Sequence, residues 1–298
     1  MDLPRFIFQA EENLVEKPWG GRWIAMLKSL EGDRIGESWE FSTHPSRPSY
    51  VMVRGKKISL VDLIQIARKE ILGNIDSGTL PILVKFLDVE GKISIQVHPT
   101  SEIARMLGER EVGKNEAWII LNGGSVYIGF KENVGKNIFE MPPAEILGKM
   151  NRFEAKYLDS FRIPAGTIHF AENTKILEIS TNSNLTYRIY DFEGRKTQAE
   201  KAIKALKMQR TRIEEVRGER GKISMEEFEA EILHLEGCLD LSTMGVFNIL
   251  ISLEGSAILR SEGEVSELKR GYSCLIPAIT GIYTIESDKA VIGKIYAK

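Results

Sequence analysis

The few histidines of this sequence are the residues whose surroundings most suggest chemistry. They are His44, His98, His169 and His234. His98 follows Gln96 in an alternating apolar stretch, so both polar side chains would point to the same face of a β-strand. Burying such a pair inside a barrel is costly unless something binds it, and a divalent metal ion would satisfy both side chains. His169 follows a Pro164-Ala165-Gly166 turn at the start of a predicted strand and could join them.

Glu116 lies between these histidines in the sequence and could supply an anionic ligand. Two histidines and one glutamate leave a position for water or substrate, which is typical of catalytic rather than structural zinc, and Gln96 could add a carbonyl oxygen. Iron, nickel and manganese accept the same ligands. Each residue also has a plain structural interpretation: His98 as a core histidine bonded to backbone, Glu116 as a surface strand residue, and His169 as the cap of a turn.

Two lysines lie in sequence surroundings that bear on whether they are functional or structural. Lys85 lies in the apolar run at residues 81–87, where an unpaired ammonium group would be costly, so a functional role is favoured. Lys114 is as compatible with a surface loop as with a functional position.

The elements that must position these residues are mostly short strands. Residues 81–87 and 93–98 are predicted to be strands, and Thr100 has the character of an N-cap that opens a short helix. Residues 117–122 and 125–130 are predicted to form a hairpin around Asn122-Gly123-Gly124. Residues 59–72 have apolar side chains at helical spacing.

The distribution of strands predicts a mainly β protein with two barrels. Many short strands at regular spacing favour barrels or sandwiches over a parallel sheet. Residues 197–217 are strongly charged and are predicted to form a long helix that connects or braces two halves. We therefore expect a larger, helix-decorated catalytic domain at residues 1–218, and a small β domain at residues 219–298.

Composition excludes several classes of function. The 298 residues carry a formal net charge of −2, which gives no general attraction to nucleic acid or anionic membranes. Two cysteines, Cys238 and Cys274, make a disulfide framework implausible, so a cytoplasmic location is expected. Neither a signal peptide nor a membrane-spanning apolar run is expected.

A series of short motifs appears in a fixed order along the first two hundred residues or so. The motifs are PILVKFLD at residues 81–88, SIQVHP at 94–99, GKNE at 113–116, PAGTIH at 164–169, Glu178, and YRIYD at 187–191, preceded by WGG at 19–21, GESW at 36–39 and His44-Pro45. In this order they resemble the type I mannose-6-phosphate isomerases of the short prokaryotic kind. Each motif alone is weak, but the ordered set is specific.

This resemblance implies a zinc enzyme that interconverts mannose 6-phosphate and fructose 6-phosphate through a cis-enediol, on two cupin-type barrels. It implies four zinc ligands: Gln96, His98, Glu116 and His169. It places Ser94, Lys85 and Lys114 near the substrate or its phosphate, and makes Arg188 the active-site arginine and Glu178 an acidic residue of the site. Arg188, Glu178 and Lys114 are the residues expected to take part in catalysis. The base stays open between Glu178, a metal-bound histidine and metal-bound water.

The sequence departs from the family pattern at one chemically important position. The family commonly has an aspartate four residues before the arginine, and Asn184 stands there. An amide cannot transfer a proton as a carboxylate does. Arg195 and Lys196 could contact phosphate, but a solvated turn is the favoured interpretation for both. His44 and His234 are interpreted as structural, and the second barrel is expected to have no metal site.

Two alternative functions remain at this stage. A cupin metal oxygenase would need a more apolar pocket and has no use for converging lysines and an arginine. A non-catalytic sugar-phosphate sensor would fit Asn184, although such a protein need not retain an open metal site. The expected partner is a small-molecule sugar phosphate, with no nucleic acid or membrane partner, and the oligomeric state is not predicted.

Overall fold

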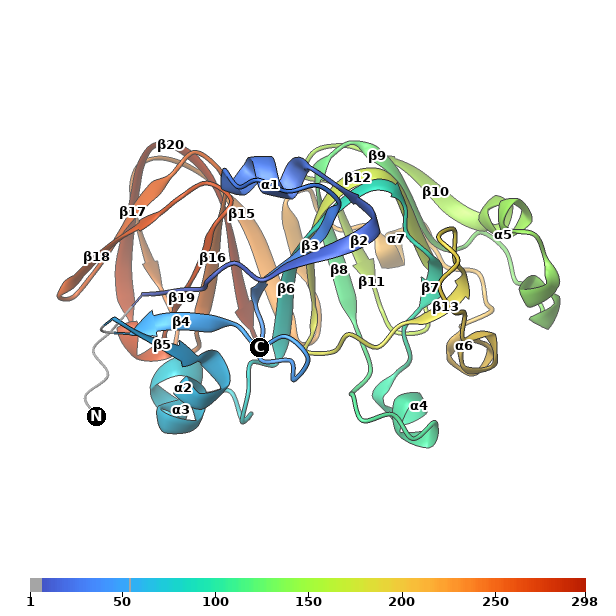
Figure 1. Cartoon of the computed structure of the whole chain (residues 1–298), viewed down its shortest axis with the longest axis horizontal. Coiled ribbons are helices and arrows are strands. Elements are labelled where there is room, and N and C mark those ends of the chain that lie inside the picture. The colour runs from blue at the N-terminus through green and yellow to red at the C-terminus, as the bar shows by residue number, and fades with distance from the viewer. Residues whose placement is uncertain (1–6, 54) are drawn as a thin grey trace.

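Two strongly curled antiparallel sheets lie side by side in this protein (Figure 1). The computed structural model describes residues 7–53 and 55–298. One sheet has ten strands and the other has eight. The prediction of a mainly β chain with two cupin-type barrels, the first larger and decorated with helices, is confirmed. Within the described residues, none of the helices is long and apolar enough to cross a membrane.

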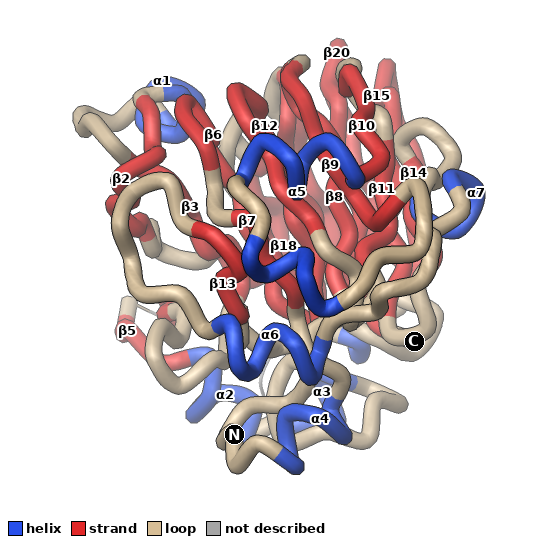
Figure 2. Tube along the Cα trace, turned by 90° about the vertical axis from the view of Figure 1, so that its right-hand side faces the viewer, coloured by secondary structure: helices blue, strands red, loops and turns tan. Residues whose placement is uncertain are grey.

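The ten-stranded sheet forms the first barrel. Its strands are β2 (Leu14–Gly21), β3 (Ile35–Phe41), β6 (Ile82–Lys92), β7 (Ile95–Val97), β8 (Glu116–Asn122), β9 (Gly124–Phe130), β10 (Met150–Ala155), β11 (Ser160–Ile163), β12 (His169–Thr181) and β13 (Tyr187–Tyr190). The helices inserted among or following them are α1 (Trp23–Lys28), α4 (Ser101–Met106), η1 (Lys136–Glu140), α5 (Pro143–Lys149), α6 (Ala199–Ala205) and α7 (Ile213–Val216). When the first barrel faces the viewer, α5 and α6 lie in front of its sheet (Figure 2).

The eight-stranded sheet forms the second barrel. It contains β1 (Phe8–Gln9), β14 (Lys222–Ser224), β15 (Phe228–Ser242), β16 (Asn248–Glu254), β17 (Ala257–Ser261), β18 (Glu264–Leu268), β19 (Ser273–Ile276) and β20 (Ile282–Ala297). A separate hairpin of β4 (Tyr50–Val53) and β5 (Lys56–Ser59) leads into α2 (Leu60–Ile66) and α3 (Arg68–Leu72), and η2 (Ala278–Thr280) precedes β20. The predicted helix at residues 59–72 is thus present, interrupted at Ala67.

The long strand β12 organises the first barrel. It pairs with β6 along most of its length, with β8 through its second half, and with β7 and β9 near its start. A bulge between Glu172 and Thr174 separates the two halves, and Asn173 there has a φ of 49°. One strand therefore carries His169 and Glu178 to positions beside four other strands.

The predicted hairpin at residues 117–130 is wrong, although both strands exist. Among the described residues β8 pairs with β11 and β12, whereas β9 pairs with β10 and β12, and the two do not pair with each other. Gly124 has a φ of 149°, and a Cβ there would lie 2.3 Å from the carbonyl oxygen of Asn173. The turn packs against the bulge of β12, so β8 and β9 take different halves of that strand as partner.

The predicted long helix at residues 197–217 is also wrong. The chain forms the short helices α6 and α7, joined by a segment that bonds to the first barrel. The backbone N–H of Lys207 donates to the carbonyl of Gly166 at 2.9 Å, and that of Thr211 donates to Phe130 at 2.8 Å. These bonds replace the helical bonds that a continuous helix would have made.

A single hydrophobic core joins the two barrels. Val84, Ile119 and Ile179 from the first sheet belong to the same buried cluster as Ile249 and Leu275 from the second. Burial of this apolar surface holds the sheets against each other.

We expect Ile179→Ala to lower the free energy of unfolding by about 2–5 kcal/mol, because it leaves a cavity in this shared core. Ile66→Ala is the matched control, since Ile66 is 60% exposed on α2, and it should change the free energy by no more than about 0.5 kcal/mol. Urea denaturation measures both. Equal effects of the two substitutions would contradict the shared core.

Candidate active site

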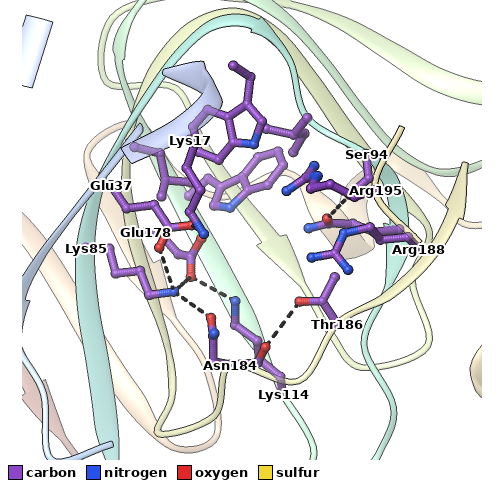
Figure 3. Close-up of a pocket in the computed structure, with 15 residues that line it drawn as sticks. Lys17, Glu37, Lys85, Ser94, Lys114, Glu178, Asn184, Thr186, Arg188 and Arg195 are labelled. Atoms are coloured by element: carbon purple, nitrogen blue, oxygen red, sulfur yellow. Dashed lines mark hydrogen bonds and ion pairs between the residues drawn. The ribbon is translucent and has the colours of Figure 1, made fainter. Parts of the chain in front are cut away.

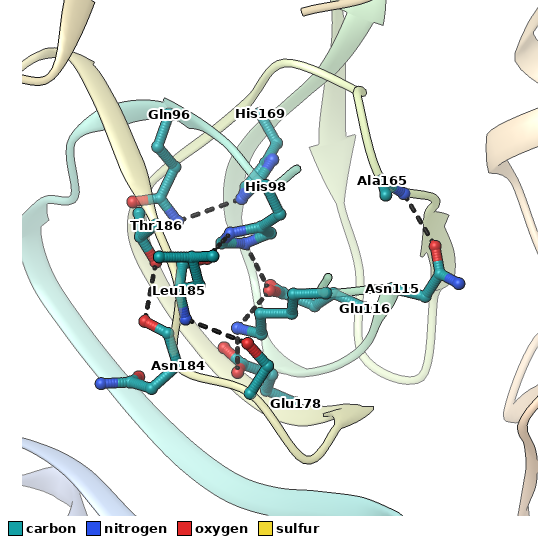
Figure 4. Close-up of polar contacts among 12 residues, drawn as sticks. Gln96, His98, Asn115, Glu116, Ala165, His169, Glu178, Asn184, Leu185 and Thr186 are labelled. Carbon is teal, nitrogen blue, oxygen red and sulfur yellow. Dashed lines mark hydrogen bonds and ion pairs between the residues drawn. The ribbon is translucent and has the colours of Figure 1, made fainter. Parts of the chain in front are cut away.

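The structure brings together three side chains that could hold a metal ion. One ligand atom from each of His98, Glu116 and His169 lies within 4.8 Å of the other two, and all three residues are buried (Figure 4). His98 directly follows β7, while Glu116 begins β8 and His169 begins β12. The pairing of β12 with both β7 and β8 is what gathers them, with His169 opposite Gln96 in the register.

The surroundings orient both imidazole rings. His98 Nδ1 lies 2.8 Å from the carbonyl oxygen of Leu185, and His169 Nδ1 lies 3.0 Å from that of Thr167. A carbonyl accepts a hydrogen bond only from a protonated nitrogen, so in each neutral ring Nε2 keeps its lone pair. Backbone orientation of a ring in this way is common among metal-ligating histidines.

The contact between His98 and Glu116 fits a cation. His98 Nε2 and Glu116 Oε2 are 2.8 Å apart and buried, and Glu116 Oε2 also lies 2.6 Å from Lys114 Nζ. Burial, followed by the charge of Lys114, lowers the pKa of His98 to about 4. At neutral pH the ring is therefore uncharged, and two acceptor atoms face each other. A metal ion between them would remove this repulsion.

Two further groups complete the shell around this trio. Gln96 Nε2 lies 3.0 Å from His169 Nε2, and the Ser94 hydroxyl donates to Gln96 Oε1 at 2.7 Å. The indole N–H of Trp118 donates to Glu116. The Gln96 side chain thus reaches the trio with its amide nitrogen toward His169, while its carbonyl oxygen, the atom that could ligate a metal, accepts from Ser94.

A chain of alternating charges runs from Glu116 into the adjacent pocket, where Figure 3 shows Lys114, Glu178, Lys85 and Glu37. Lys114 Nζ lies 2.6 Å from Glu116 and 2.8 Å from Glu178. Lys85 Nζ lies 3.8 Å from Glu178 and 3.7 Å from Glu37. Burial alone would lower the pKa of Lys114, but the two carboxylates raise it above its ordinary value. Burial alone would likewise raise the pKa of Glu116, yet Lys114 holds it well below its usual range. Both groups therefore remain charged at neutral pH.

Asn184 lies against Lys85. Its side-chain oxygen accepts a hydrogen bond from Lys85 Nζ at 3.0 Å, and its backbone N–H donates to Glu111 at 2.6 Å. Burial lowers the pKa of Lys85. His44 lies outside the metal trio, where its Nε2 is 3.1 Å from Glu111. The hydrogen bond with His44 outweighs the opposing effect of burial, and the pKa of Glu111 falls to about 2.

Two arginines form the opposite wall of the pocket (Figure 3). Arg195 donates to Asp191 Oδ2 at 2.9 Å through Nε, and its terminal nitrogen lies 2.7 Å from the same oxygen. The Nε of Arg188 is buried, has no hydrogen-bond partner among the described residues, and lies 3.9 Å from that oxygen. Burial, followed by the charge of Arg195, lowers the pKa of Arg188. One carboxylate thus faces two guanidinium groups, which leaves positive charge for an anion.

All nine residues proposed from the sequence lie around this one location. Six line the pocket: Lys85, Ser94, Gln96, Lys114, Glu178 and Arg188. The other three, His98, Glu116 and His169, form the adjoining trio. Their catalytic and ligand roles remain predictions.

Other pocket residues escaped the sequence argument. Lys17, Trp19, Glu37 and Arg195 also line the pocket. Trp19 and Glu37 lie within motifs that could have identified them, whereas nothing in the sequence distinguishes Lys17. The interpretation of Arg195 as part of a solvated turn is wrong, because its side chain is ion-paired with Asp191 and lines the wall of the pocket. Lys196 is exposed, and His234 is exposed on β15.

Comparison with known proteins gives consistent matches. Residues 7–116 match the model of the phosphomannose isomerase type I catalytic domain, and residues 222–294 match that of the mannose-6-phosphate isomerase cupin domain. The putative mannose-6-phosphate isomerase YvyI of Bacillus subtilis is 28% identical over 302 residues, covering 93% of this chain and 95% of YvyI.

Solved structures agree over the full length. A putative mannosephosphate isomerase from Archaeoglobus fulgidus has a TM-score of 0.92 and 41% identity, over 100% of this chain and 99% of its own. The mannose 6-phosphate isomerase of Bacillus subtilis has a TM-score of 0.85 and 25% identity, over 97% of this chain and 99% of its own.

We expect His98→Ala and His169→Ala each to lose bound metal, because each removes one of few ligands. His234→Ala is the matched control, since this exposed histidine lies on the second barrel. Metal content after zinc loading and dialysis, measured by atomic emission, gives the result. Full metal retention by both His98 and His169 variants would contradict the assignment of the trio.

Proposed function

This chain belongs to the type I phosphomannose isomerase family, and on that basis we propose that it interconverts mannose 6-phosphate and fructose 6-phosphate with the help of a divalent metal ion. The observation that carries the proposal is the facing pair of buried acceptor atoms on His98 and Glu116, next to a pocket walled by lysines and arginines. The first feature suits a cation, and the second suits a phosphorylated substrate. Their adjacency suits a reaction on a sugar phosphate.

His98, Glu116 and His169 would hold the metal, with Gln96 as the fourth ligand. Two histidines and a carboxylate match the donor set of catalytic zinc, and zinc is the ion we propose. When bound, the ion would polarise the sugar oxygens at C1 and C2 and stabilise negative charge on an enediolate.

Moving a proton between C1 and C2 requires a base beside the sugar. We assign this role to Glu178, a buried carboxylate of the pocket that is not among the proposed ligands. In the direction of fructose 6-phosphate, Glu178 would remove the proton from C2 and return it to C1, while the hydroxyl proton passes from O2 to O1 within the cis-enediolate. Lys114, held 2.8 Å from Glu178, stays protonated and would stabilise negative charge on a substrate oxygen. Asn184 transfers no proton in this scheme; its side-chain oxygen accepts a hydrogen bond from Lys85 and orients that lysine.

The phosphate would bind to Arg188, with Arg195 beside it. Both guanidinium groups lie across the pocket from Lys85 and Glu178 (Figure 3). Binding energy from this remote group would orient the reacting carbons against the base. The Ser94 hydroxyl lies on the same wall and can contact the bound sugar.

The charge of the pocket also bears on the alternative functions, an oxygenase and a sugar-phosphate sensor. Five basic residues line it: Lys17, Lys85, Lys114, Arg188 and Arg195. An oxygenase acting on an apolar substrate would not need them. A sugar-phosphate sensor would share them, so activity must distinguish a sensor from an isomerase.

The purified protein should form fructose 6-phosphate from mannose 6-phosphate. Activity should disappear after chelation and return when zinc is added, because the ligand trio needs a cation to place the sugar oxygens. A coupled assay of fructose 6-phosphate measures this directly. A folded, zinc-loaded protein that binds mannose 6-phosphate without converting it would support the sensor.

We expect Arg188→Ala to lower kcat/KM for mannose 6-phosphate by about 100-fold or more while zinc content stays unchanged, because the phosphate loses its anchor. Arg260→Ala, on strand β17 of the second barrel, removes a comparable charge far from the pocket and serves as control. Steady-state kinetics and metal analysis of the two variants decide the matter. Turnover by Arg188→Ala close to that of the unmodified protein would exclude this arginine from the site.

A further inference from the structure

A buried ion pair lies where the two barrels meet. Lys28, the last residue of α1, and Glu40 on β3 are each 4% exposed. Lys28 Nζ lies 2.9 Å from Glu40 Oε1 and donates to Oε2 at 3.1 Å. Figure 1 shows α1 above β3, on the side that faces the second barrel.

The second barrel supplies the remaining partners of this pair. The Ser273 hydroxyl on β19 donates to Glu40 Oε2 at 2.9 Å, and Lys28 Nζ donates to the carbonyl of Gly271 at 2.6 Å. The Tyr272 hydroxyl donates to the carbonyl of Lys28 at 3.1 Å. Gly271 has a φ of 78°, and a Cβ there would lie 2.7 Å from the carbonyl oxygen of Leu27, so glycine permits this close approach. The segment before β19 is thus built to hold the pair.

The other face of β3 forms a wall of the active-site pocket. Ser38 donates to Glu40 Oε1 at 2.6 Å, which places these two side chains on the face toward the second barrel. Glu37 and Trp39 share the opposite face, where the Trp39 indole N–H donates to Glu37 at 2.7 Å. These two contact Lys85: Glu37 at 3.7 Å, and the Trp39 ring with its centroid 4.2 Å from Nζ. The same short strand therefore touches the second barrel on one side and a pocket lysine on the other.

We propose that Glu40 is a positioning residue, through which the second barrel fixes strand β3 and so sets the place of Lys85 in the pocket. This gives the second barrel a role in the reaction without any substrate contact. The inference rests on the proposed function for its kinetic test only. Glu40 and Lys28 themselves lie on the far side of β3 from the pocket.

Stability alone is a weak explanation for this ion pair. Replacing a buried ion pair by apolar residues of similar size is often neutral or stabilising, because the desolvation cost offsets the attraction. The shared apolar core already joins the barrels. Unlike apolar packing, the contacts of this pair are directional. Hydrogen bonds to Glu40 from Ser38, Ser273 and Lys28 define the position of one residue of β3.

The test uses the full-length, zinc-loaded protein and two variants. Lys28→Met/Glu40→Leu removes both charges together, so no unpaired charge remains buried. Ser273→Ala removes one bond from the second barrel and keeps the pair. Tyr157→Phe is the matched control, because the Tyr157 hydroxyl donates to Glu254 of the second barrel at 2.7 Å and takes no part in the contacts of the Lys28–Glu40 pair that the described residues show.

We expect the double variant to lower kcat by about tenfold to 100-fold while KM for mannose 6-phosphate changes by less than about threefold, because Arg188 on β13 still binds the phosphate. Ser273→Ala should show a smaller fall in kcat, and Tyr157→Phe none. Zinc content and Tm should match those of the unmodified protein. An unchanged kcat in the stably folded double variant, or an equal loss in Tyr157→Phe, would overturn the proposal.

A second measurement does not depend on isomerase activity. The rate at which Lys85 reacts with acetic anhydride is measured by mass spectrometry, relative to exposed Lys131. In the double variant this rate should change by about threefold or more, because the neighbours of the amine move, and in Tyr157→Phe it should not change. If the unmodified protein fails to isomerise mannose 6-phosphate, this measurement alone decides between a displaced Lys85, which supports the proposal, and an unmoved one, which refutes it.

Discussion

Burial of charged side chains inside the first barrel is the constraint on which the rest of the structure depends. Lys85, Lys114, Glu116 and Glu178 are each at most 4% exposed. A buried charge is tolerated only with a partner of opposite sign, so each must sit within a few ångströms of the next. The same arrangement that satisfies these charges lines a pocket with cations and places an unprotonated imidazole against a carboxylate.

This requirement makes strand register decisive. Glu178 stands opposite Lys85 on β6 and Trp118 on β8, and Ser180 stands opposite Glu116. A slip of one residue in β12 would turn Glu178 away from the barrel interior and remove one carboxylate from each lysine, leaving Lys114 with Glu116 alone and Lys85 with Glu37 alone. The bulge at Asn173 and the Gly124 turn packed against it oppose such a slip, because they match one register alone. Features that look like irregularities of the sheet thus protect the geometry of the site.

The second barrel contributes to the same geometry from outside. Its apolar face completes the shared core, and its Ser273 and Gly271 bond to the Lys28–Glu40 pair. Apolar packing is strong but directionless, whereas these hydrogen bonds are directional. The two kinds of contact together explain how a barrel distant from the metal trio can influence the pocket wall.

The sequence by itself determined the local elements and the residue types of the site. Alternation predicted that Gln96 and His98 share a face, and the N-cap Thr100 predicted α4. The distribution of short strands predicted the two barrels, and the ordered motifs predicted the full set of nine site residues. Tertiary structure alone decided which strands pair. The hairpin of β8 and β9 and the long charged helix failed because β12 and the first barrel offered better partners for the same backbone groups. Lys17 joined the pocket through its ion pair with Glu37, which lies on another strand, so no local pattern records that contact. Arg195 is held by Asp191, four residues earlier in the chain, but only the fold places this local pair at the pocket.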